Sequence, residues 1–93
     1  MSDEELLRRL CEGNALELMT SSVFVFPDEA AIQHLITNYP EFAELYKRDT
    51  MMETLNGYGI KLAESFLASS DPADRYRGTN LQYFIDGMNQ IAN

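Results

Sequence analysis

The side chains that could do acid–base chemistry in this chain are carboxylates spaced one helical turn apart. Asp71 and Asp74 have this spacing, and so do Glu41 and Glu44. A general acid needs a carboxyl group whose pKa is shifted by a pocket, and nothing around either pair predicts one. We therefore interpret both pairs as capping or solvated surface residues and not as catalytic dyads.

The chain has a single histidine, His34, and a single cysteine, Cys11. His34 lies nearly opposite the apolar positions of its helical pattern, which predicts a solvated side chain. Cys11 falls among leucines and is predicted to be a small buried residue, because Glu12 beside it disfavours the thiolate. The G-x-G sequence at residues 57–59 lacks the third glycine and the preceding strand of a dinucleotide-binding loop. We expect no catalytic residue, no metal ligand and no cofactor.

Acidic side chains are concentrated in one half of the chain. The formal net charge is −8; residues 1–46 hold nine carboxylates and two arginines, whereas residues 47–93 hold six carboxylates and five cations. This balance argues against direct binding of DNA or RNA, because such binding relies on cations that neutralise phosphates. An acidic helical face can instead occupy a basic protein surface by presenting carboxylates in place of phosphates. The alternative is that the negative charge only keeps the domain soluble and does not bind a partner.

These features predict a non-enzymatic, acidic, protein-binding regulator, an inhibitor or antagonist that occupies a basic or nucleic-acid-binding surface of a partner protein. The residues expected to contact the partner are Glu4, Glu5, Glu12, Glu17, Met51 and Tyr58. The alternative for the Met51 and Tyr58 face is peripheral core under a neighbouring helix. Glu53, Glu64 and Asp86, from the balanced half, are expected to contribute much less. The alternative is a chaperone or adaptor that shields an apolar segment of a client through Met51 and Tyr58, since methionine and tyrosine make adaptable contacts. A small enzyme is the third alternative.

Length and composition predict one helical domain, residues 1–93, with a modest core. No apolar run approaches the roughly 18 residues of a membrane span, and the acidic N-terminus is unlike a secretory signal. We therefore expect a cytoplasmic protein that does not contact membranes. A homodimer is expected too, because so short a chain carries more apolar surface than one small core needs. In size and acidity the chain is similar to many small bacterial and phage-borne inhibitors, immunity proteins and secretion chaperones.

The hydrophobic pattern predicts an all-α fold, a small bundle of four to five helices. Ser2 and Glu5 form a capping box that begins the first helix, and Asp71 caps the last. Residues 3–20 form either one helix or two short helices that meet at Gly13.

The longest helical pattern covers residues 40–68 and predicts a long central helix. Its core positions follow alternating steps of three and four, which places on one face Leu45, Arg48, Met52, Leu55, Gly59, Leu62 and Phe66. Gly57 and Gly59 either break this helix in two or allow another backbone to approach closely. Residues 23–26 suit a short extended segment, which is either a connector pressed into the core or an edge that pairs with another chain.

Overall fold

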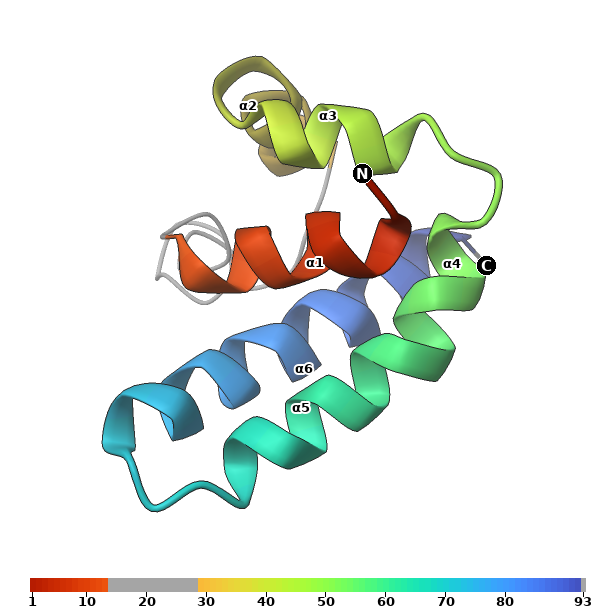
Figure 1. Ribbon diagram of the computed structural model, residues 1–93. Helices are drawn as coiled ribbons and strands as arrows, with labels where there is room; N and C mark the ends of the chain where they lie inside the picture. Colours follow the sequence, from red (N-terminus) through yellow and green to blue (C-terminus); the bar gives the residue numbers. More distant parts are fainter. Residues whose placement is uncertain (14–28, 93) are drawn as a thin grey trace.

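The computed structural model describes residues 1–13 and 29–92 of the chain (Figure 1). In chain order the elements are α1 (Asp3–Glu12), α2 (Glu29–Asn38), α3 (Pro40–Tyr46), α4 (Met51–Thr54), the π-helical turn η2 (Leu55–Gly59), α5 (Ile60–Leu67) and α6 (Pro72–Ala92). No strand occurs within these two ranges, so the predicted all-α bundle is confirmed. The extended segment predicted at residues 23–26 lies outside the described residues, and so does Glu17.

Helix α1 begins and ends where local chemistry dictates. The Ser2 hydroxyl accepts the backbone N–H of Glu5 at 3.2 Å, which confirms the predicted cap. One face buries four residues in the core, which are Leu6, Leu7, Leu10 and Cys11. The helix ends at Glu12, because Gly13 takes an extended conformation while its N–H still bonds the Arg9 carbonyl. A single helix over residues 3–20 is therefore excluded.

Helix α1 lies at the centre of the bundle. Figure 1 shows it between α2 and α3 on one side and the antiparallel pair α5 and α6 on the other. Phe42 on α3 makes an edge contact with Phe84 on α6, with ring centroids 5.9 Å apart. Both rings are fully buried, so the core is continuous from α3 to α6.

The prediction of one helix over residues 40–68 is wrong between residues 47 and 50, where the chain turns. The pattern placed Arg48 on a buried face, but a guanidinium cannot stay unpaired among apolar side chains. Its side chain instead pairs with Asp3 at 2.7 Å and with Glu44 at 3.1 Å. The long helical pattern therefore belongs to two separate helices, α3 and the helix that begins at Met51.

From Met51 to Leu67 the helix is continuous, because the residues at both junctions of η2 keep right-handed helical dihedrals. Its most buried positions recur every four residues, at Met51, Leu55, Gly59 and Ala63. In a pure α-helix, steps of four drift around the axis by about 40° each. The wider π-helical turn in the middle counteracts this drift and keeps the four positions on one face. Of the adjacent Met51 and Met52, Met51 lies in the core and Met52 is only partly buried against it.

Two glycines allow helices to approach closely. A Cβ on Gly59 would lie 3.2 Å from the Ile85 side chain and 3.4 Å from that of Leu7, so side chains of α6 and α1 pack against this glycine, and the predicted close approach of another backbone is not seen there. On α6, Gly78 faces α5 at still shorter range. Asp71 caps α6 as predicted, because its carboxylate accepts the Ala73 N–H at 3.0 Å.

Candidate partner-binding surface

The structure separates the residues that were expected to contact a partner. Glu4, Glu5 and Glu12 are exposed on α1, and Tyr58 is half-buried on η2. Met51 is only 7% exposed and belongs to the core, as the peripheral-core interpretation of this residue expected, so it is not available as a surface contact. The cause is the turn before α4, which resets the phase of the helix that follows.

Glu4 and Tyr58 meet at an open groove between the start of α1 and the α4–η2 helix. The groove has a volume of about 640 Å³, and its lining residues are Ser2, Asp3, Glu4, Thr50, Glu53, Thr54, Gly57 and Tyr58. We call it the α1–α4 groove. The groove brings together Glu4, from the acidic half of the sequence, and Tyr58, from the π-helical turn. No sequence pattern predicted that these two residues share one surface.

Asp3 holds the two walls of the groove together. Its carboxylate accepts hydrogen bonds from Arg48 at 2.7 Å, from Thr54 at 3.0 Å and from the Thr50 hydroxyl. These bonds, that from Thr50 first and that from Arg48 second, hold the pKa of Asp3 below its ordinary value. Arg48 pairs with this carboxylate, so Asp3 joins α1 to the turn before α4 and to α4 itself.

Sequence reasoning did not find this role of Asp3, because Arg48 lies 45 residues away along the chain. The available signal was the arginine itself, since a charged side chain within an apolar stripe needs a partner. The acidic first turn of another helix can supply such a partner for the arginine.

Glu4 and Glu53 carry the negative charge of the α1–α4 groove. Both side chains are exposed, and neither forms an ion pair within residues 1–13 and 29–92. Glu53, from the half of the chain that was expected to contribute little to partner binding, lines the same groove as Glu4. Glu12 lies at the far end of α1, about 12 Å along the helix from Glu4, and does not line the groove.

The lining of the groove also includes a bare stretch of backbone and an aromatic ring. A Cβ on Gly57 would meet nothing within 4 Å, so the main chain is open to an approaching molecule. Tyr58 packs against the core while it lines the groove. π-Helical turns occur often at functional sites, and tyrosine is common at the centre of protein interfaces. Carboxylates beside an aromatic ring suit a cationic side chain, through ion pairs and cation–π contact.

His34 and Cys11 lie where the sequence placed them. His34 is exposed on α2, and its ring nitrogen contacts the Asn38 amide at 3.3 Å. Cys11 is buried, and burial, with a smaller contribution from Glu12, raises the pKa of its thiol to about 12. Neither side chain lines the α1–α4 groove.

We expect Cys11 in the folded protein to react with iodoacetamide at pH 8 about a thousandfold more slowly than in the urea-unfolded chain. The thiolate is the reacting species, and a pKa raised from 9.0 to about 12 lowers its population by that factor. Mass spectrometry of timed samples measures both rates. Similar rates in the two states would mean that the α1 face carrying Cys11 is open to solvent.

Within the described ranges, no three histidine, cysteine or acidic side chains are grouped to hold a metal ion. Nor does any helix there combine the length and the apolar character that crossing a membrane requires. Comparisons of the chain with protein-family models, with curated proteins and with solved structures find no match.

Proposed function

We propose that this protein is a non-enzymatic regulator that binds a basic surface of a partner protein through the α1–α4 groove. The observation that carries the proposal is that Glu4 and Glu53 line an open groove together with Tyr58 and the bare backbone of Gly57. Exposed carboxylates accelerate encounter with a cationic surface, and an aromatic ring beside them supplies contact area.

The same groove supports an antagonist mechanism. A partner that normally holds nucleic acid does so with lysine and arginine side chains, and carboxylates can pair with those cations in place of phosphates. Once the partner's basic surface occupies the groove, the cations of that surface are neutralised and its nucleic acid is displaced. The partner therefore loses activity by competition and not by any chemical change.

The burial of Met51 weighs against the chaperone alternative. That alternative needs an exposed, adaptable apolar face made by Met51 and Tyr58, and only Tyr58 is accessible. The two functions also differ in their response to salt, because added salt weakens an electrostatic contact and leaves an apolar one nearly unchanged. The homodimer expected from the sequence stays a prediction.

We expect the double variant Glu4→Gln/Glu53→Gln to associate with a basic surface about three- to tenfold more slowly at low salt, with a flatter salt dependence. The probe is a fluorescein-labelled peptide of arginine, lysine and alanine, and stopped-flow anisotropy over a salt series measures its association rate. Circular dichroism checks that the helices are retained.

The matched control is Glu12→Gln/Glu29→Gln, which removes the same charge from exposed positions outside the α1–α4 groove. We expect this control to change the association rate by less than half as much. Equal effects from the two variants would show that the charge acts as a diffuse field, and the groove would then not be the binding site.

A further inference from the structure

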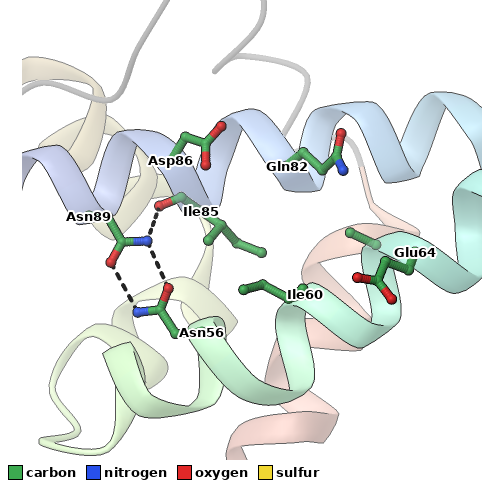
Figure 2. A pocket seen from close by; sticks show the side chains of 8 residues that line it. Asn56, Ile60, Glu64, Gln82, Ile85, Asp86 and Asn89 are labelled. Carbon is green, nitrogen blue, oxygen red and sulfur yellow. Dashed lines mark hydrogen bonds between the residues drawn. The ribbon is translucent and has the colours of Figure 1, made fainter.

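A second groove lies on the other flank of the π-helical turn, between α5 and α6 (Figure 2). It has a volume of about 340 Å³. Its apolar part is made by Ile60, Ala63 and Ile85, and polar side chains surround these residues. We call it the α5–α6 groove. None of its lining residues was expected from the sequence to contact a partner.

One end of this groove is closed by two asparagines. The Asn56 amide donates to the Asn89 oxygen at 3.0 Å, and the Asn89 amide donates back to the Asn56 oxygen at 2.9 Å. Each amide also donates to a backbone carbonyl of its own helix, Asn56 to Met52 and Asn89 to Ile85. Figure 2 shows this reciprocal pair bridging η2 and α6. The pair fixes the width of the groove at that end.

The rim of the groove is acidic and comes from both helices. Glu64 stands on α5, whereas Gln82 and Asp86 stand on α6 (Figure 2). Neither carboxylate forms an ion pair with any residue that the structure describes. Lys61, although exposed on α5, does not line the groove. Two uncompensated carboxylates in one groove favour a cationic ligand.

The apolar part of the groove specifies the shape of that ligand. Ile60 is 41% exposed, a large fraction for an isoleucine in the middle of a folded chain, and it lies next to the buried Ile85. An aliphatic stem that covers Ile60 removes apolar surface from water. The groove therefore suits an aliphatic chain that ends in a cation, as in arginine and lysine.

Arginine fits the polar rim better than lysine does. A guanidinium presents five N–H donors in one plane, and it can bond a carboxylate and an amide oxygen at the same time. Glu64, Asp86 and Gln82 together offer acceptors from both walls. An ammonium has only three donors, and it bonds a carboxylate as a point charge without this bidentate geometry.

We propose that the α5–α6 groove receives one arginine side chain of a partner protein. The inference deepens the proposed function and rests on it, because the arginine belongs to the same basic surface. The two grooves share η2: Asn56 lines the α5–α6 groove, and Gly57 and Tyr58 line the α1–α4 groove. A partner seated in one groove is therefore adjacent to the other, and the arginine anchors it.

The test uses propylguanidinium, which reproduces the arginine side chain, as the probe for the isotope-labelled full-length protein. We expect saturable chemical-shift changes at the methyl groups of Ile60 and Ile85 and at the Gln82 amide. Propylammonium should bind more weakly, and the neutral isostere propylurea more weakly still. The variant Glu64→Gln/Asp86→Asn should weaken propylguanidinium binding at least about tenfold, because charge-assisted hydrogen bonds are lost.

The control Glu12→Gln/Glu29→Gln, which removes the same charge from exposed positions outside both grooves, should leave the shift changes at Ile60 and Ile85 unchanged. Equal affinity for propylurea would overturn the proposal, as would shift changes that survive Glu64→Gln/Asp86→Asn. Failure of the proposed function is a separate result: peptide association would then be insensitive to Glu4→Gln/Glu53→Gln, while propylguanidinium still bound to Ile60 and Ile85.

Discussion

We expect Gly78→Ala to lower the free energy of unfolding by about 1–3 kcal/mol. A Cβ at this position would lie 2.9 Å from Leu67 Cγ and 3.0 Å from both the Ala63 carbonyl oxygen and Phe66 Cβ. The carbonyl belongs to the helix backbone and cannot rotate away. Helix α5 must therefore move off α6, and this helix pair is the most extensive contact in the fold.

The matched control is Gly57→Ala, which makes the same change on the neighbouring helix. Its Cβ would meet nothing within 4 Å, and no described glycine has a positive φ. We expect this variant to raise the free energy of unfolding by about 0.5–1 kcal/mol, because alanine loses less conformational entropy on folding.

Urea unfolding followed by circular dichroism measures both glycine variants, and thermal melts repeat the comparison at about 4–8 °C per kcal/mol. The diagnostic result is the opposite sign of the two changes. If Gly78→Ala were as stable as the parent protein, the spacing of α5 and α6 would not depend on Gly78.

The second large effect concerns Asp3. We expect Asp3→Asn to lower the free energy of unfolding by about 1–3 kcal/mol at pH 7, because charge-assisted bonds to Arg48 and the bonds from Thr50 and Thr54 are weakened. The Asp3 side chain is only 15% exposed, so water replaces these bonds poorly. The control is Asp49→Asn, which removes an exposed carboxylate from the adjacent turn and should stay within about 0.5 kcal/mol of the parent.

The stabilisation from Asp3 should depend on pH in one direction. The pKa of Asp3 is lowered by folding, so the folded state favours the carboxylate and the unfolded chain binds the proton more readily. The contribution is complete above the ordinary value of 3.8 and is lost as the pH falls below it. Stability curves of the parent and Asp3→Asn should converge at acid pH. A gap that stayed constant down to pH 2 would mean that the carboxylate charge is not the cause.

The parts of the fold that the sequence predicted well depend on neighbouring residues. Ser2 and Asp71 are helix caps because their side chains bond N–H groups two or three residues later. Cys11 lies in the core because it shares one helical face with leucines, and His34 is exposed because it lies off such a face. Each of these predictions needs only the geometry of one helix.

The errors come from contacts between distant residues. The local hydrophobic pattern predicted that the helix continues through residues 47–50. In the structure the chain turns there, and Arg48 in this turn pairs with Asp3. Once that turn is made, the following helix starts in a new phase, and Met51 takes the core position expected for Met52.

The candidate site was predictable only in part for the same reason. Glu4 and Tyr58 were both predicted from the sequence to contact a partner. Their position in one groove, however, depends on how α1 packs against η2. The α5–α6 groove depends likewise on the distance between two helices, and the Asn56–Asn89 pair that closes it joins residues 33 positions apart. No periodicity in the sequence reports such a pairing.

The central place of α1 has a consequence for synthesis of the protein. Its four buried residues pack against elements that follow it in the chain, the last of which is α6. A ribosome adds roughly 5–20 residues per second, so the apolar face of α1 waits several seconds for Phe84 and Met88 to be made. During that interval the apolar side chains of α1 have no partner that buries them, and a ten-residue segment alone is only marginally helical. The bundle therefore closes only after nearly all of this sequence has been translated.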